Sequence, residues 1–361
     1  MKSSFIHISI ILFVAIVIGT SCTEKPEEIL IWNDPPTTAD TLYQNPVFQP
    51  DLADPTVVRA ADGSFYAYGT ENNWSAGIHR TVPILKSKDL VNWEYVTDAF
   101  VARPSWKSEG GVWAPDVTFV NSKYYMYYSI STWGDSNPGI GLAISDLPYG
   151  PFVDQGKVFD SKSIGVNNSI DPYFIQTGTG RNKKSYLFWG SFQGIYGIEL
   201  SADLKTPVGN KFKIANGNFE ATYILEREGK FYFFGSLGSC CEGADSRYRV
   251  AVAAATSITG PYLDKSGNSI SDVGQEGTLF LSGDREWGWV GPGHNAEIVT
   301  DDHGNDFFLY HAIDVRNPYL VGGATRRPLM LDKISWVEGW PKIKDGLPSK
   351  TLQPAPYFER N

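Results

Sequence analysis

The sequence predicts an all-β protein folded as a five-bladed β-propeller, and three observations lead to this prediction. Aromatic residues make up 14% of the chain and glycine occurs 36 times. Stretches with helical periodicity are few, so short strands joined by glycine-rich turns are expected. A pattern of paired strands recurs five times after the N-terminal segment, over about 320 residues, a length that one repeat-built domain can reach.

Each copy of the repeat starts with an acidic residue or a histidine, continues as an apolar strand and, after a turn, becomes a strongly aromatic second strand. The opening residues are Asp54, Asp116, Asp171, Glu220 and His294. The aromatic strands are expected at residues 65–68, 124–128, 186–189, 231–234 and 307–310. Successive copies begin 49 to 74 residues apart, which fits four-stranded blades with loops of varied length.

The first strand of each propeller blade lines the central channel, so the five opening residues are predicted to converge near one mouth of that channel. A single acidic residue at the start of a strand would more simply be a cap in a loop. The same position filled by an acid or a histidine in all five copies indicates a functional site.

The N-terminus is expected to direct export. Residues 1–22 are predicted to be a signal peptide, because Lys2 precedes an apolar run over 5–18 that is too short to span a bilayer comfortably, and small residues lead to Cys22. The pattern resembles a bacterial lipoprotein signal with a lipidated Cys22, although Gly19 stands where a larger apolar residue is usual; an ordinary cleaved signal is the alternative. Residues 23–44 are then a polar tether and 45–361 the catalytic propeller.

The formal net charge of −9 argues against nucleic acid and anionic membrane surfaces as ligands and is compatible with a neutral substrate. We expect a monomer that touches a membrane only through its lipid anchor, as an outer-membrane lipoprotein on the periplasmic or cell-surface side, or else a secreted protein. Besides Cys22 the chain holds only Cys240 and Cys241, so no disulfide framework is expected.

Several blocks of sequence around the opening residues resemble glycoside hydrolase family 43. They are Ala53–Pro55, Trp113–Asp116, Ser169–Pro172 and Phe219–Ala221. Other stretches resemble the arabinan endo-1,5-α-L-arabinosidases of that family, namely Gly238–Gly243, Thr259–Gly267, Gly291–Asn295 and Tyr310–His311. The resemblance extends from about residue 45 to about residue 347. It implies hydrolysis of internal α-1,5 linkages of arabinan, a plant cell-wall polysaccharide.

The resemblance also implies an inverting mechanism with three carboxyl groups. Asp54 corresponds to the general base that activates water, Glu220 to the general acid that protonates the leaving oxygen, and Asp171 to the residue that orients Glu220 and keeps it protonated. Inversion requires an acid and a base roughly 6.5–9.5 Å apart, with room for water between them. A neighbouring carboxylate raises the pKa of the acid.

The remaining candidates have weaker signals. His294 resembles the family residue that helps hold one calcium ion in the channel, largely through water; a simple channel hydrogen bond is the alternative. Asp116 is expected to shape the pocket floor or bind sugar hydroxyls, with a structural role as the other possibility. Trp113 is expected to stack on a sugar, whereas His311 is expected to be a hydrogen-bonded histidine of an inner strand.

Two alternatives to an endo-acting arabinanase remain open at this stage. The first is an exo-acting α-L-arabinofuranosidase or β-xylosidase of the same fold, because loop lengths do not show whether the groove is closed at one end. Ala53, where many arabinanases have histidine, and Ala221-Thr222, where they have Gly-Pro, keep that question open. The second is a non-catalytic glycan-binding propeller, against which the three intact carboxylates argue.

Overall fold

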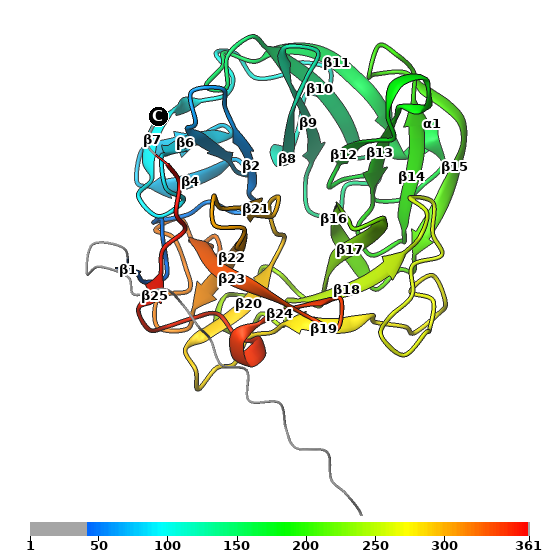
Figure 1. Cartoon of the computed structure of the whole chain (residues 1–361). Coiled ribbons are helices and arrows are strands. Elements are labelled where there is room, and N and C mark those ends of the chain that lie inside the picture. Colours follow the sequence, from blue (N-terminus) through cyan, green and yellow to red (C-terminus); the bar gives the residue numbers. More distant parts are fainter. Residues whose placement is uncertain (1–41, 360–361) are drawn as a thin grey trace, which may run out of the picture. The chain divides into compact units, whose positions relative to one another are not determined.

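The structure is a computed structural model that describes residues 42–359. Within this range five sheets of four or five strands are arranged around one axis, which confirms the predicted five-bladed β-propeller (Figure 1). The predicted signal peptide and Cys22 lie outside the described residues. No helix in the described range is long and apolar enough to cross a membrane.

The blades follow one another along the chain, and all neighbouring strands are antiparallel. Blade I contains β2 (Thr56–Arg59), β3 (Phe65–Tyr68), β6 (Pro83–Ser87) and β7 (Glu94–Asp98). Blade II contains β8 (Gly111–Val120), β9 (Lys123–Ser131), β10 (Gly139–Ser145) and β11 (Val153–Asp160). Blade III contains β12 (Tyr173–Thr177), β13 (Lys184–Trp189), β14 (Ile195–Leu200) and β15 (Pro207–Ala215). Blade IV contains β16 (Phe219–Arg227), β17 (Lys230–Leu237), β18 (Arg249–Ala255) and β19 (Thr278–Leu281). Blade V contains β20 (Trp289–Gly293), β21 (Val299–Thr300), β22 (Asp306–Asp314), β23 (Leu329–Val337) and β24 (Trp340–Ile343).

Short elements complete the described chain. They are the hairpin β4 (Asn72–Ser75) and β5 (Ile78–Arg80), the helix α1 (Ser161–Ile164), three 3₁₀ turns at Gly180–Asn182, Gly243–Asp245 and Lys344–Gly346, and the pair β1 (Leu42–Tyr43) and β25 (Gln353–Pro354). Because β1 pairs with β25, Leu42 and Tyr43, which were predicted from the sequence to lie in the tether, belong to the folded part of the chain. Tyr43 also donates a hydrogen bond to the carbonyl of Leu331 in blade V.

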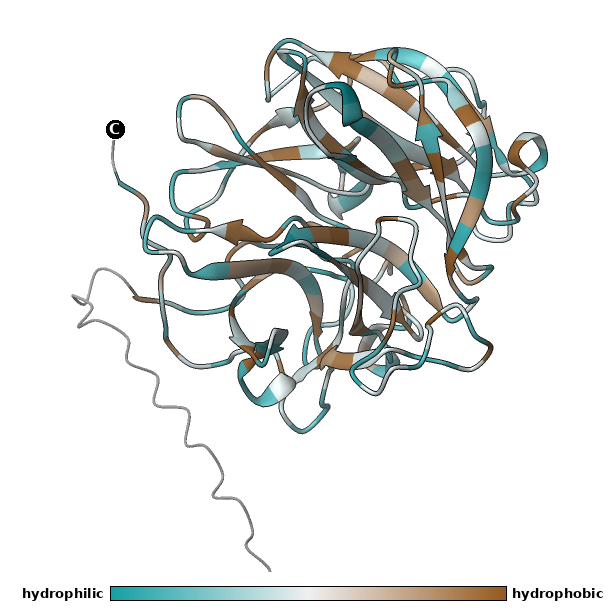
Figure 2. Cartoon of the chain, turned by 45° about the vertical axis from the view of Figure 1, so that its right-hand side comes forward, coloured by the Kyte–Doolittle hydropathy of each residue, from teal (hydrophilic) through white to brown (hydrophobic). Residues whose placement is uncertain are grey.

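The aromatic second strands are buried because each lies inside a blade that packs against neighbouring blades on both faces. All four residues of β3 are buried, and so is every residue of β17 after Lys230. Aromatic rings from different blades interlock, as in the edge-to-face contact of Tyr173 with Tyr223 at 5.4 Å, a preferred geometry for such pairs. Figure 2 shows that apolar residues are carried mainly by the strands.

Each blade has one residue in the left-handed backbone conformation just before, within or just after its first strand. These residues are Asp54 (φ 53°), Ala114 (φ 44°), Asp171 (φ 57°), Ala221 (φ 56°) and His294 (φ 43°). Non-glycine residues adopt this conformation rarely and at a cost, and such residues often cluster at functional sites. The repeat therefore exists, but two of its predicted members are out of register: Asp116 lies two residues past Ala114 and Glu220 one residue before Ala221.

A ring of hydrogen bonds fixes these five positions. Four of their N–H groups donate to a side chain of the preceding blade: Ala114 to Thr70 Oγ1 at 2.8 Å, Asp171 to Ser129 Oγ at 3.0 Å, His294 to Ser236 Oγ at 2.9 Å, and Asp54 to His311 Nδ1 at 3.1 Å. The N–H of Ala221 donates to the carboxylate of Asp171. Each blade thus positions the first strand of the next, and His311 closes the ring from blade V to blade I.

Candidate active site

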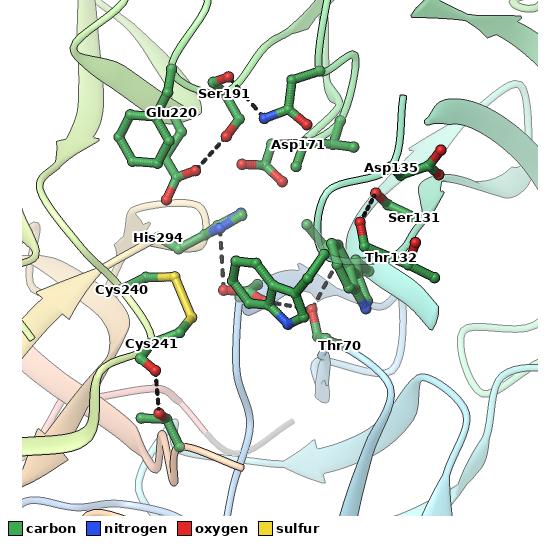
Figure 3. A pocket seen from close by; sticks show the side chains of 18 of the residues that line it. Thr70, Ser131, Thr132, Asp135, Asp171, Ser191, Glu220, Cys240, Cys241 and His294 are labelled. Carbon is green, nitrogen blue, oxygen red and sulfur yellow. Dashed lines mark hydrogen bonds and ion pairs between the residues drawn. A yellow bond between two sulfur atoms is a disulfide. The ribbon is translucent and has the colours of Figure 1, made fainter. Parts of the chain in front are cut away.

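Four of the five left-handed residues, Asp54, Ala114, Asp171 and His294, line a cavity of about 940 Å³ at one mouth of the channel. All five blades contribute to its wall. The lining includes Asp54, Thr70 and Asn72 of blade I, Trp113 and Trp133 of blade II, Asp171 and Ser191 of blade III, Glu220, Cys240 and Cys241 of blade IV, and His294, Tyr319 and Arg327 of blade V. Figure 3 shows Asp171, Glu220 and His294 pointing into this space. The structure therefore brings together the three predicted catalytic carboxyl groups, His294 and Trp113.

Asp54 is held as an ionised carboxylate. Its Oδ1 lies 2.7 Å from Nη1 of Arg327 and 3.3 Å from Nδ1 of His294, while Oδ2 accepts a 2.6 Å hydrogen bond from the hydroxyl of Thr70. Burial alone would raise the pKa of Asp54, but the charges of Arg327 and His294 outweigh it and hold the pKa well below its ordinary value. A carboxylate that stays charged in this way can act as a base.

The pKa values of Glu220 and Asp171 are shifted in the opposite direction to that of Asp54. Burial is the main cause that raises both pKa values, and that of Asp171 reaches about 8 despite the nearby charge of His294. Glu220 Oε2 accepts a 2.6 Å hydrogen bond from Ser191, and the hydroxyl of Tyr248 bonds the same carboxyl. The charge of Glu220 further raises the pKa of Asp171, so the two carboxyl groups are expected to titrate as a pair.

His294 contributes one nitrogen beside Asp54. Burial opposes its protonation, but Asp54, Asp171 and Glu220 together raise its pKa. The described residues contain no cluster of three or more His, Cys, Asp or Glu side chains that could hold a metal ion. Calcium prefers six to eight oxygen ligands, so these side chains do not form a calcium cage by themselves.

Asp116 does not line the cavity. It lies within β8, 5% exposed, and one carboxylate oxygen accepts a 2.7 Å hydrogen bond from the N–H of Phe174. Its carboxyl group also shares a hydrogen bond with the carboxyl of Glu297, and burial followed by the charge of Glu297 raises the pKa of Asp116 well above its ordinary value. The two-residue offset from Ala114 explains this placement, which favours the structural alternative over a sugar-binding role.

Four of the eleven tryptophans fall into two groups, one at the cavity wall and one in the core. Trp113 and Trp133 lie side by side at the cavity wall, with ring centroids 5.7 Å apart, and Trp133 is 78% exposed. Trp74 and Trp189 are buried in hydrophobic clusters. Exposed aromatic faces with this placement can stack on sugar rings.

Several site residues carry no sequence signal of their own. Arg327 lies in the segment just before β23, and Thr70, Ser191 and Tyr248 reach the carboxylates from elsewhere on blades I, III and IV. Thr70 and Ser236 accept two of the hydrogen bonds in the ring described above. Thr70 follows the second strand of its blade and Ser236 lies near the end of the second strand of its own, so an alignment of the repeats could have suggested a shared role for them. Arg327 has no counterpart in the repeat.

His311 is fully buried, as expected of an inner-strand histidine. Its Nδ1 accepts the N–H of Asp54, so the ring proton of the neutral imidazole lies on Nε2. Burial, followed by the charge of Arg327, lowers the pKa of His311 well below its ordinary value. His311 therefore supports Asp54 as a neutral acceptor.

The adjacent residues Cys240 and Cys241 form a disulfide, which was not predicted from the sequence. It does not connect distant segments, so it is no framework in the usual sense. Both cysteines line the cavity, and Figure 3 shows the sulfur–sulfur bond bordering it.

Comparison with known proteins gives a consistent result. Residues 43–341 match the family described as "Glycosyl hydrolases family 43". The chain is 34% identical to an extracellular endo-α-(1→5)-L-arabinanase of Bacillus subtilis, over 80% of this chain and 87% of that protein. It is 30% identical to an extracellular exo-α-(1→5)-L-arabinofuranosidase of Cellvibrio japonicus, over 82% and 87% of the two chains. Among solved structures, an α-L-arabinanase of Cellvibrio cellulosa in complex with arabinohexaose is 28% identical, with a TM-score of 0.71 over 83% of this chain and 97% of that one.

Proposed function

The chain belongs to glycoside hydrolase family 43 and is a glycoside hydrolase, and from this premise we propose that it cleaves internal α-1,5-L-arabinofuranosyl linkages of arabinan with inversion. The observation that carries the mechanism is that the carboxyl groups of one cavity have pKa values shifted in opposite directions. Asp54 is held ionised, while burial raises the pKa values of both Glu220 and Asp171.

In the proposed reaction Asp54 removes a proton from a water molecule as that water attacks the anomeric carbon. Glu220 donates its proton to the leaving glycosidic oxygen, so the sugar emerges with inverted configuration. Arg327 and Thr70 orient the base by binding different oxygens of Asp54. The charge of Asp171 disfavours ionisation of Glu220 until the leaving oxygen takes the proton.

Action on internal linkages is supported by the size of the site. A volume of about 940 Å³ lies at the upper end of the usual range for small-ligand pockets, about 300–1,000 Å³. Trp133 is exposed at the wall and offers a further stacking surface. The exo-acting relative in Cellvibrio japonicus keeps release of single small products from a chain end as the second candidate.

Product analysis on debranched arabinan tests this proposal. Internal cleavage yields a mixture of oligosaccharides from the start of the reaction, exo-cleavage yields one small product, and a glycan-binding propeller yields none. Proton NMR of the first products identifies the anomer formed. Retention of configuration would rule out the assigned roles of Asp54 and Glu220.

Two further parts of the proposal concern location and calcium. Both relatives named above are extracellular by name, which supports export of this chain, and we propose attachment to the outer membrane through a lipid on Cys22. We also propose that His294 helps to hold one calcium ion in the channel, largely through water molecules. No catalytic step depends on that ion.

A further inference from the structure

We propose that the Cys240–Cys241 disulfide is an apolar contact surface for an arabinofuranosyl unit bound beside the general acid. This inference rests on the proposed function, and it assigns to blade IV a binding role in addition to the general acid. The disulfide borders the same cavity as the catalytic carboxyl groups (Figure 3).

The position of the disulfide follows from strand pairing in blade IV. Glu220 on β16 pairs with Ser236 on β17, and Cys240 follows Ser236 by four residues. At most about 14 Å of extended chain therefore separates Cys240 from Ser236, the strand partner of Glu220. A general acid must lie within hydrogen-bond reach of the leaving oxygen, so the two sugars that this oxygen joins are bound near Glu220, and one of them can reach the disulfide.

The chemistry of the disulfide suits one face of a sugar ring. Both cysteines are partly exposed, and a disulfide has no hydrogen-bond donor. Divalent sulfur is soft and polarisable, so it gains dispersion energy from C–H groups of a sugar without competing for its hydroxyls. Trp113 and Trp133 provide a further apolar surface of the cavity, from blade II.

The loop that carries the disulfide is fixed before substrate arrives. The carbonyl of Cys241 accepts a 2.8 Å hydrogen bond from the hydroxyl of Thr325 in blade V, and the N–H of Gly243 donates to the same hydroxyl at 3.2 Å. Gly243 has a positive φ of 56°, and a Cβ there would meet the ring of Tyr319 at 2.4 Å. A surface held in this way loses little freedom when it binds a ligand.

The test uses full-length Glu220→Gln protein, which retains the cavity and is expected to turn over substrate at least about 10²-fold more slowly, and isothermal titration with arabinohexaose. Cys240→Ser/Cys241→Ser opens the ring and makes the surface polar. Cys240→Val/Cys241→Val opens it equally but keeps the surface apolar, so it is the matched control. The serine variant is expected to bind about tenfold more weakly, as loss of about 50 Å² of apolar contact predicts, and the valine variant about two- to threefold more weakly.

Reduction of the unsubstituted disulfide by tris(2-carboxyethyl)phosphine, which yields two thiols and the phosphine oxide, provides a second comparison without a folding risk. Weaker hexaose binding by the reduced protein is expected. Equal affinity of the oxidised, reduced and serine forms would overturn the inference. So would an equal loss in the serine and valine variants, because the disulfide would then act only through loop geometry. Absence of hexaose binding with the disulfide intact would instead overturn the proposed substrate, and the inference with it.

Discussion

Nη1 of Arg327 lies 2.7 Å from Oδ1 of Asp54, and both side chains are almost fully buried. This ion pair joins the segment preceding β23 to the start of β2, so blade V controls the ionisation of a residue on blade I. Removal of one partner leaves the other charge buried without its main compensation, which is strongly destabilising.

Substitution of the two principal carboxylates should separate catalysis from stability. Glu220→Gln and Asp54→Asn are each expected to lower kcat by at least about 10²-fold, because general acid–base assistance contributes about 10²–10⁴-fold. Asp54→Asn should also lower the free energy of unfolding, on the order of 3 kcal/mol, whereas Glu220→Gln should not. Steady-state kinetics on arabinan and urea unfolding measure the two effects. Near-normal turnover in either variant would show that its role is misassigned.

Asp171→Asn should move the alkaline limb of the pH–rate profile to lower pH. In the wild type that limb reports loss of the last proton from the Asp171–Glu220 pair, which mutual repulsion delays. A neutral neighbour removes the repulsion, while the acid limb, set by Asp54, should stay nearly in place. The maximum rate should fall as well, because orientation of Glu220 is lost. An unshifted alkaline limb would contradict the assigned role of Asp171.

The same variant should be more stable than the wild type at alkaline pH. Since burial raises the pKa of Asp171 to about 8 from 3.8, its contribution to stability is present below the unfolded-state value and is lost as pH rises toward 8. Asparagine carries no such penalty and tolerates the positive φ. The difference in Tm, variant minus wild type, should therefore grow between pH 4 and pH 8. A constant difference would mean that Asp171 titrates normally.

Arg327→Gln should raise the pKa of Asp54 and so move the acid limb of kcat/KM to higher pH. The lowered pKa of Asp54 contributes stability above the unfolded-state pKa, and this contribution is lost as pH falls. The variant should therefore be less stable at pH 7 and lose less stability on acidification. Arg327→Lys, which keeps the charge but not the planar fork, is the control and should restore part of the shift. Identical acid limbs in all three proteins would exclude this role.

Asp116→Asn should leave kcat on arabinan within a few-fold of the wild type, because Asp116 lies outside the cavity and bonds Phe174 and Glu297. The substitution should instead change how Tm depends on pH, because the pKa of the buried Asp116 carboxyl is raised. A loss of activity comparable to that of Glu220→Gln would restore the sugar-binding role.

Chelation tests the calcium proposal. Calcium added back to chelator-treated protein should raise Tm in a concentration-dependent way, and His294→Ala should abolish the increase. An unchanged Tm in the wild type would remove calcium from the proposal.

The sequence by itself determined the propeller and the number of blades and located the candidate catalytic carboxylates, because an internal repeat and strand periodicity are local patterns that survive without coordinates. Asp54 and Asp171 were placed correctly since each precedes a proline and opens its strand. Asp116 looked equivalent in sequence, but only the backbone shows that Ala114 holds the left-handed position and that a two-residue shift along β8 takes a side chain out of the cavity.

Only the tertiary structure decided which partners set the pKa values. Arg327 reaches Asp54 across 273 residues of sequence, Ser191 reaches Glu220 from blade III, and Tyr248 reaches it from another part of blade IV. Such contacts depend on how the ring of blades closes, and the strength of a charge interaction depends on burial and distance. Neither quantity is encoded in the identity or spacing of the residues that take part.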